Sequence, residues 1–391
     1  MFIKYFCCLL SVVGVTYGQV SDNDVSEVAT KDFGNVIESC EDFGNAVMDT
    51  LNGDVNILMN PFADIECLNF TTFNLTSGNK LTISSSENLE NYHGSSSFSN
   101  VRLNVQEGSV LTIENNVLFH SPERDHSDLP DVNGGAFSIG VGSEVRFLND
   151  FKTQYIGIRS QTEESSDFAN HENNGGVIYN LGKFVVTGKA IFEHSENSGG
   201  GESSPGPGGC LYNGGSMLFK GGLDVTDVSI LDDEGNNGGA LWNSGTVRIS
   251  GSCKFARNFA EAGGSLYNSE GGTIIFKKGS SVVFNDVSAS DGVGGAITNF
   301  GYMNFKGSAL FLEGRSYYEG GAIVIGKTGL MKMSKNTVFF GNRSGNTGAP
   351  VNVRIGGEFE FSKKTYFISN VGDGFDATCP TVYFEDEEVC V

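Results

Sequence analysis

Residues 238–243, Gly-Gly-Ala-Leu-Trp-Asn, decide how this chain folds because the sequence repeats their pattern. Each copy has two glycines, a small residue, an aliphatic residue, usually an aromatic residue, and an asparagine. Full copies occupy residues 175–180, 208–213, 263–268 and 294–299, and weaker copies begin at Gly134, Gly320 and Gly348. Successive copies begin between 25 residues (238 to 263) and 41 residues (134 to 175) apart. A repeat of this period indicates a solenoid, a propeller or an array.

The remainder of each repeat has the pattern of short strands. After each asparagine, apolar and polar residues alternate, as in residues 246–250 and 302–306, which is typical of a strand with one buried side. A third short run ends in phenylalanine, as in residues 253–255. Three strands in about 28 residues fit one turn of a parallel β-helix, whereas a propeller blade needs four strands and an ankyrin unit needs helices.

Stacked turns place equal positions one strand spacing apart, so like residues form ladders. An asparagine ladder at one corner would exchange amide hydrogen bonds between turns, and the crossover rule favours a right-handed coil. The predicted asparagine ladder comprises Asn180, Asn213, Asn243, Asn268 and Asn299, and a phenylalanine column comprises Phe192, Phe255, Phe311, Phe339 and Phe367. We therefore predict an all-β fold, a single right-handed parallel β-helix solenoid with a short N-terminal helical cap.

A second motif accompanies the Gly-Gly phrase. Phe-x-x-Asn occurs at residues 255–258, 339–342 and 367–370. Together the two motifs resemble the repeats of the chlamydial polymorphic outer-membrane proteins, which are autotransporter adhesins, and more broadly the pectate-lyase-like right-handed β-helix proteins. The resemblance covers roughly residues 134 to 370. It implies a β-helix scaffold that hosts adhesins as well as polysaccharide lyases, hydrolases and epimerases.

The chain divides into four expected parts. Residues 1–18 have a lone Lys4 and an apolar run, which predicts a secretory signal peptide, with an N-terminal anchor as the alternative. Residues 19–53 form the expected cap, in which Phe43, Val47 and Leu51 share one face of a short helix. Residues 54–375 form the β-helix, and residues 376–391 form an acidic C-terminal tail with a cysteine pair.

The charge composition of the chain limits the classes of partner that it can bind. The chain has 47 acidic and 25 basic residues and a net charge of −22, which argues against nucleic acid or an anionic membrane. No later apolar run approaches the ~20 residues of a transmembrane helix, so we expect no transmembrane segment. The prediction is a secreted, extracellular or cell-surface protein that binds an extracellular glycan or surface protein, without a cofactor or metal. The sequence sets no oligomeric state.

Six cysteines remain after the predicted signal peptide, which suggests disulfide bonds in an exported chain. Nearness in sequence favours Cys40 with Cys67 and Cys379 with Cys390, each closing one end of the solenoid. Cys210 and Cys253 are expected to be unpaired core thiols, with a bond between them as the alternative. Three N-glycosylation sequons begin at Asn69, Asn74 and Asn342.

The strand alternation also predicts a binding surface. It directs four aromatic side chains outward in one column, which could contact sugar rings or a protein: Tyr179, Tyr212, Trp242 and Tyr267. The alternative is that an insert covers this column or that the face assignment is inverted. Polar inserts at residues 121–132, 161–174 and 195–207 project from corners, either as binding loops or as solvated connections.

Catalytic chemistry has weaker support. The densest acidic cluster includes residues 232–234, Asp-Asp-Glu, which could hold Ca²⁺ but fit a solvated loop better in so acidic a chain. Glycoside hydrolysis needs two carboxylates at about 5 to 9.5 Å, and the sequence contains no polygalacturonase-type constellation. We therefore expect a non-enzymatic role in adhesion, wall or matrix association, or glycan binding. The alternative is a polysaccharide-modifying enzyme on the same scaffold.

Overall fold

The computed structural model describes one compact unit, which lies within Phe33–Val391. The described residues are 36–59, 63–75, 78–85, 95–106, 108–121, 133–159, 174–198, 208–231, 237–290, 292–346, 348–372, 381–384 and 387–390. The predicted signal peptide lies outside them. The unit is a right-handed parallel β-solenoid, which confirms the predicted fold class.

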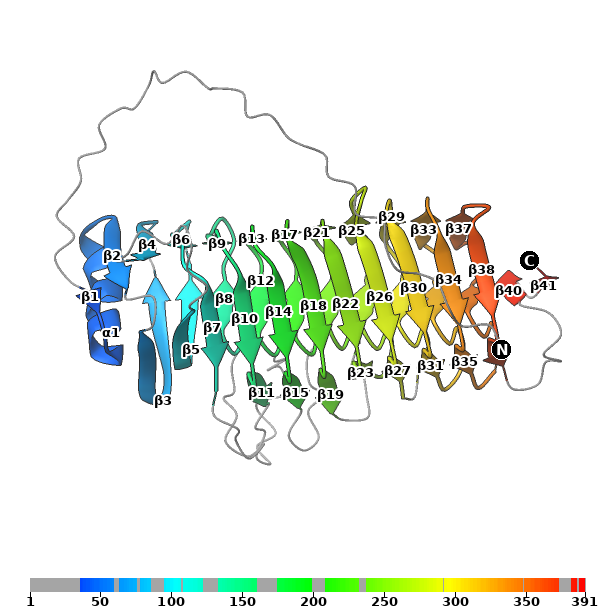
Figure 1. Cartoon of the computed structure of the whole chain (residues 1–391), viewed down its shortest axis with the longest axis horizontal. Coiled ribbons are helices and arrows are strands. Elements are labelled where there is room, and N and C mark those ends of the chain that lie inside the picture. The colour runs from blue at the N-terminus through cyan, green and yellow to red at the C-terminus, as the bar shows by residue number, and fades with distance from the viewer. Residues whose placement is uncertain are drawn as a thin grey trace, which may run out of the picture. The chain divides into compact units, whose positions relative to one another are not determined.

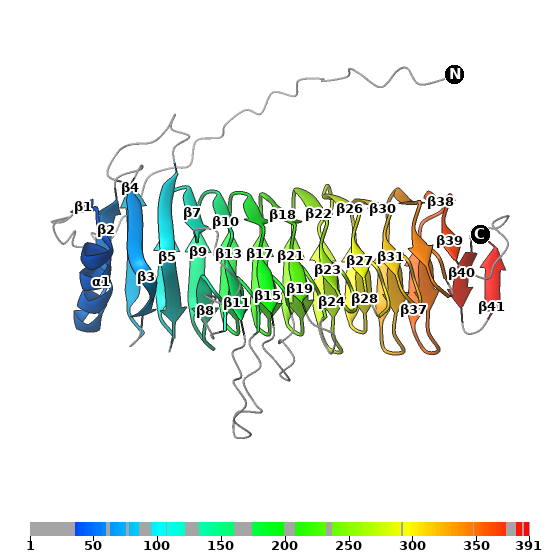
Figure 2. The same cartoon turned by 90° about the horizontal axis from the view of Figure 1, so that it is seen from below.

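Each regular turn of the solenoid has four strands, which we number as faces 1 to 4 in chain order (Figures 1 and 2). Face 1 carries the end of each Gly-Gly phrase, and β40 (Thr381–Phe384) extends this face without one. The strands that follow a phrase are β8 (Phe137–Ile139), β12 (Ile178–Asn180), β16 (Leu211–Asn213), β20 (Leu241–Asn243), β24 (Leu266–Asn268), β28 (Ile297–Asn299), β32 (Ile323–Ile325) and β36 (Val351–Val353). Face 2 is a twelve-stranded sheet: β1 (Val36–Ile37), β2 (Val55–Met59), β4 (Lys80–Ser85), β6 (Val110–Ile113), β9 (Glu144–Phe147), β13 (Lys183–Val186), β17 (Ser216–Phe219), β21 (Thr246–Ile249), β25 (Thr273–Phe276), β29 (Tyr302–Phe305), β33 (Leu330–Met333) and β37 (Glu358–Phe361).

The third run of each repeat forms face 3: β7 (Val117–His120), β10 (Phe151–Gln154), β14 (Ala190–Glu193), β18 (Gly222–Thr226), β22 (Ser252–Ala256), β26 (Ser281–Asn285), β30 (Ser308–Leu312), β34 (Thr337–Phe340) and β38 (Thr365–Ile368). Face 4 has eight strands, one per regular turn: β11 (Gly157–Arg159), β15 (Glu196–Ser198), β19 (Ser229–Leu231), β23 (Phe259–Ala260), β27 (Ser288–Ala289), β31 (Arg315–Ser316), β35 (Arg343–Ser344) and β39 (Val371–Gly372). The sequence analysis predicted three strands per turn. It missed face 4 because strands of two or three residues are too short to show an alternation.

The first turns are irregular. Two long strands, β3 (Asp64–Leu75) and β5 (Ser96–Val105), each run through face 3 and on into face 1. Residues Ser96–Ser99 of β5 pair with β7, and Leu103–Val105 pair with β8. The chain crosses between the two faces at Asn100, where φ is +58°. The Gly-Gly phrases begin only after these turns.

The core is a stack of apolar side chains along the solenoid interior. On face 3, the register aligns Phe255, Phe284, Phe311, Phe339 and Phe367, with ring centroids 4.7 to 5.0 Å apart. Phe192 belongs to the same column but is separated from Phe255 by Val225. Each turn thus buries its apolar side against the turns before and after it, so the core continues along the length of the solenoid.

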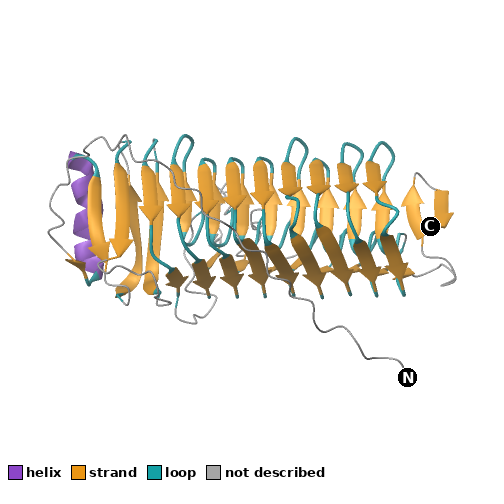
Figure 3. Ribbon diagram, turned by 45° about the horizontal axis from the view of Figure 1, so that its top comes forward, coloured by secondary structure: helices purple, strands orange, loops and turns teal. Residues whose placement is uncertain are grey.

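A helix closes the N-terminal end, α1 (Cys40–Asp49), followed by the 3-10 turn η1 (Thr50–Asn52). Ser39 caps it by accepting a hydrogen bond from the Asp42 backbone N–H at 3.1 Å. Phe43 and Val47 of the helix are buried. The helix lies at the end of the solenoid, beside the first strands (Figure 3). Leu51, expected on the same apolar face, falls in η1 and is 58% exposed.

A disulfide joins Cys40 of α1 to Cys67 of β3, with the Cα atoms 5.3 Å apart, which confirms that predicted pair. At the other end, β40 pairs antiparallel with β41 (Glu387–Cys390). The predicted Cys379–Cys390 bond cannot be followed because Cys379 lies outside the described residues. Within the described part of the chain, no helix has the length and apolar character needed to cross a membrane.

Candidate functional site

The Gly-Gly phrase brings the chain from face 4 into face 1. Gly238 has φ +76°, a left-handed conformation that glycine adopts without steric cost. A Cβ on Gly239 would lie 2.3 Å from the carbonyl oxygen of Gly264 in the next turn. The two glycines therefore have different structural roles. The first allows the left-handed turn of the chain, and the second allows consecutive turns to approach closely. This corner fixes the register of the residues that follow.

The aromatic column follows directly from that register. Tyr179 pairs with Tyr212, Tyr212 with Trp242, and Trp242 with Tyr267 on consecutive strands of face 1. Before each of these residues the aliphatic side chain is buried, and after it the asparagine is buried. All four aromatic side chains are half-buried on the outer side of the strands. Ser138 and Thr298 continue the same column at its two ends.

The rings of this column stack on one another. Ring centroids are 5.0 Å apart for Tyr179 and Tyr212, and 4.6 Å apart for Tyr212 and Trp242, with ring planes within 25° of parallel. Tyr267 contacts Phe300 at 5.8 Å, and burial raises the pKa of its phenol. Tyr212 thus has a stacked ring on each side, so a partner meets the edge of this ring. The contact of this column with sugar rings or with a protein stays a prediction.

Directly beneath the column runs a chain of buried amides. The Nδ2 of Asn180 donates to Oδ1 of Asn213 at 2.6 Å, and the same bond continues through Asn243, Asn268 and Asn299 at 2.7 to 2.8 Å. Every amide points the same way along the solenoid. The buried amides bond to one another and to corner carbonyls, except that Oδ1 of Asn180, at the start of the ladder, has no partner among the described residues. The ladder fixes the strand register beneath the aromatic residues.

Comparison with known proteins adds no family to this geometry. No family model, curated protein or solved structure matches the chain.

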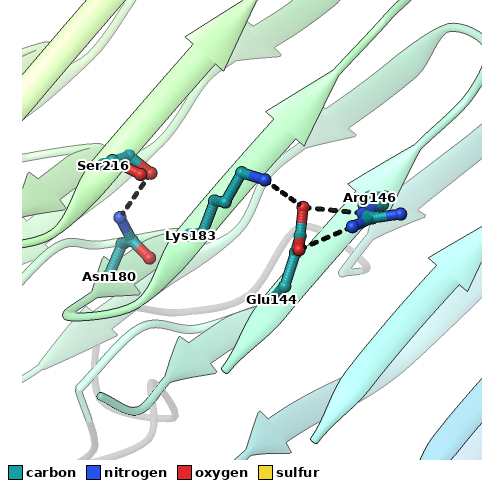
Figure 4. A network of polar contacts seen from close by, with 5 residues as sticks. All are labelled: Glu144, Arg146, Asn180, Lys183 and Ser216. Atoms are coloured by element: carbon teal, nitrogen blue, oxygen red, sulfur yellow. Dashed lines mark hydrogen bonds and ion pairs between the residues drawn. The ribbon is translucent and has the colours of Figure 1, made fainter. Parts of the chain in front are cut away.

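A charged network lies on face 2 beside the asparagine corner (Figure 4). Glu144 accepts two hydrogen bonds from the Arg146 guanidinium at 2.6 and 2.8 Å, and the Lys183 ammonium lies 2.8 Å from the same carboxylate. The Arg146 hydrogen bond, followed by the Lys183 hydrogen bond, lowers the pKa of Glu144 despite partial burial. The Asn180 amide donates to the Ser216 backbone carbonyl at 3.1 Å, so polar contacts join neighbouring turns here.

Face 3 carries charges on its outer side in the N-terminal half. Lys152 pairs with Glu193 at 2.9 Å and Lys189 pairs with Asp224 at 2.6 Å. Each of these carboxylates thus forms an ion pair with a lysine from the preceding turn.

The same face is apolar in its C-terminal half. Two outward columns run across β26, β30, β34 and β38, and Phe340, Tyr366 and Ile368 are between 41% and 54% exposed. The first column comprises Val283, Leu310, Val338 and Tyr366. The second column comprises Asn285, Leu312, Phe340 and Ile368. Sequence reasoning missed this strip, although the runs of apolar residues at both alternate positions were a signal for it.

A left-handed corner separates face 3 from face 4 and was also missed. One residue per turn has positive φ, including Tyr155, His194, Asp227 and Arg257. The Tyr155 and His194 rings stack at 4.9 Å, and the Arg257 guanidinium donates two hydrogen bonds to Asp227 at 2.5 and 2.6 Å. The Arg257 hydrogen bond lowers the pKa of Asp227. The sequence did not reveal this corner because most of its positions hold residues other than glycine.

The three sequons are not equivalent. Asn342 is fully buried, its Nδ2 donates to the Phe311 carbonyl and to Asn370 Oδ1, and its Oδ1 accepts from the Gly314 N–H. This position has no room for a glycan in the folded solenoid, so the predicted use of Asn342 is corrected. Asn74 is exposed and accepts a hydrogen bond from Asn104. The Asn69 side chain is outside the described set.

Cys210 and Cys253 are both buried free thiols. Burial raises the pKa of each thiol, that of Cys253 to about 12, so neither is a reactive thiolate at neutral pH. The acidic cluster at residues 232–234 and most of the three predicted inserts lie outside the described residues. Among the residues that are described, no three His, Cys, Asp or Glu side chains gather to hold a metal ion.

Proposed function

We propose that this chain is a secreted or cell-surface β-helix that binds an extracellular glycan without catalysis. The observation that carries the proposal is the half-exposed aromatic column on four consecutive strands of face 1. The solenoid repeats this surface along its axis, which suits an extended partner that makes one contact per turn.

The chemistry of the column favours a hydroxyl-rich partner. Three phenol hydroxyls and one indole N–H supply polar groups, and the ring edges supply apolar contact beside them. The buried asparagine ladder holds the column in register, so little conformational entropy is lost on binding. Secretion is supported by the apolar N-terminal run, and glycosylation at Asn69 and Asn74 belongs to the same proposal.

Replacing the central ring tests the site. Trp242→Ala should weaken retention on the glycan that binds the wild-type protein by at least about tenfold, the loss expected for a central aromatic contact. A glycan array with the purified secreted protein identifies that ligand, and surface plasmon resonance measures the change.

The matched control is Tyr302→Ala, which removes a half-buried aromatic side chain from face 2. Both variants must keep the wild-type circular dichroism spectrum. Equal retention by Trp242→Ala and the wild type would exclude the column as the binding site. If the wild-type protein were retained only on protein arrays, the ligand of the column would be a surface protein and not a glycan.

A further inference from the structure

An open groove with a volume of about 860 Å³ lies at the C-terminal part of face 4. It is lined by residues of β31, β35 and β39 together with Tyr317, Tyr318 and Asn346. Backbone hydrogen bonds continue the ladder past the strands, because the Gly345 and Asn346 N–H groups donate to the carbonyls of Ser316 and Tyr318. The groove is therefore built on regular, hydrogen-bonded backbone.

Two arginines lie side by side in this groove. The parallel register pairs Arg315 of β31 directly with Arg343 of β35, and both side chains are exposed. Elsewhere on the described strands, charges that meet in direct register have opposite sign, namely Glu144 with Lys183, Asp224 with Lys254, and Lys332 with Glu360. Like charges on opposite positions repel each other, so this pair departs from the pattern of the solenoid.

Neighbouring carboxylates only partly offset the pair. Arg315 reaches Asp286 at 3.6 Å through one nitrogen, which leaves most of its N–H donors free of that contact. Glu319 is engaged by Arg354 at 3.0 Å. Within the described ranges, no carboxylate forms an ion pair with Arg343. An anion between the two guanidinium groups would relieve their repulsion.

The two tyrosines indicate which kind of molecule bears the anionic group. Tyr317 and Tyr318 are 58% and 45% exposed, and their rings meet edge to face with centroids 4.8 Å apart. The edge of one ring meets the face of the other, and both tyrosines line the same groove as the two arginines. The forked donors of an arginine bind carboxylate or sulfate groups in a bidentate manner. A saccharide ring has apolar C–H groups for the aromatic surface and hydroxyls for the phenols and the Asn346 amide.

We propose that this groove binds an anionic saccharide, whose carboxylate or sulfate group lies between Arg315 and Arg343. The site is separate from the aromatic column, so neither proposal depends on the other. The chain as a whole has a net charge of −22 and repels polyanions. A short anionic oligosaccharide that contacts only the groove should therefore bind with less electrostatic repulsion than a long polyanion.

The test is isothermal titration calorimetry of the full chain with four probes of similar length. They are an oligogalacturonate, a heparin-derived sulfated oligosaccharide, a neutral cello-oligosaccharide and a phosphoserine peptide. We expect binding of the galacturonate, the sulfated probe or both, and the stronger of the two identifies the anionic group. Arg343→Gln should weaken that binding at least tenfold, and added salt should weaken it further.

Arg248→Gln is the matched control, because Arg248 is an exposed arginine on β21 of face 2 and its loss changes the net charge equally. Trp242→Ala should leave this binding unchanged. Arg343→Lys keeps the charge but loses the fork, so an intermediate loss is expected, and it replaces Arg343→Gln if that variant fails to fold. Equal binding of the neutral probe that persists in Trp242→Ala, binding of the phosphopeptide alone, insensitivity to both Arg343 variants, or no binding would each overturn the proposal.

Discussion

At the scale of single residues, the second glycine of each Gly-Gly phrase controls how closely turns stack. A Cβ on Gly176, Gly239 or Gly295 would come within 2.4 Å of a glycine carbonyl oxygen in the next turn. That oxygen belongs to the backbone ladder and cannot move away as a flexible side chain could. The phrase Gly-Gly is thus required by backbone contact as well as by the turn.

Gly239→Ala should therefore lower the free energy of unfolding by about 2 to 3 kcal/mol, the range for overpacking a tight interior. Gly271→Ala is the comparison, because Gly271 has φ +81° but no atom within 4 Å of an added Cβ. Its strain alone should cost about 1 kcal/mol. Urea unfolding followed by circular dichroism measures both, and an equal effect of the two variants would contradict the close-approach argument.

At the scale of elements, α1 protects the open end of the solenoid. Phe43 contacts the rings of Phe73 and Phe98 at 5.1 and 5.3 Å, so the helix extends the aromatic core beyond the first turns. The disulfide between Cys40 and Cys67 ties this helix to β3. Covering the first strands in this way prevents their edges from pairing with other chains.

Replacing both cysteines, Cys40→Ser with Cys67→Ser, should lower stability by about 3 kcal/mol, as expected for a bond that closes a loop of 27 residues. The loss should be local, because a solenoid unfolds turn by turn. Hydrogen exchange read by mass spectrometry should show lost protection in α1, β2 and β3, with β22 to β30 unchanged. Uniform loss along the chain would show that the cap does not act locally.

At the scale of the whole molecule, ion pairs join neighbouring turns on a strongly acidic surface. Hydrogen bonds from Arg146 and Lys183 lower the pKa of Glu144, and those from Arg257 lower the pKa of Asp227. A carboxyl group whose pKa is lower in the folded state stabilises the fold above its unfolded pKa of about 4. That stabilisation is lost as the pH falls through the lower folded pKa.

Glu144→Gln combined with Asp227→Asn should lower stability at pH 7 by about 1 kcal/mol, since exposed ion pairs contribute little each. The difference from the wild-type protein should shrink as the pH falls below about 4. Protonation at low pH reduces the repulsion among the other acidic residues equally in both proteins. The difference in stability between the two proteins therefore reports only the two ion pairs. Thermal melts from pH 7 to pH 3 measure it, and a constant difference across this range would contradict the assignment.

The repeat itself determined the solenoid. Glycine pairs, alternation and recurring asparagines each reflect a local requirement, namely a left-handed turn, a one-sided strand and a satisfied buried amide. Nearness in sequence also identified the Cys40–Cys67 bond. These features could be predicted because every turn meets the same neighbours.

Tertiary structure decided what depends on contacts between turns. The ring-on-ring stacking of Tyr212 and Trp242, the burial of Asn342 and the short strands of face 4 follow from register across turns. The pairing of Arg315 with Arg343 is the clearest case, because 28 residues separate them and no motif marks either one. A sequence records which residues recur, but only the stacked backbone fixes which side chains share a surface.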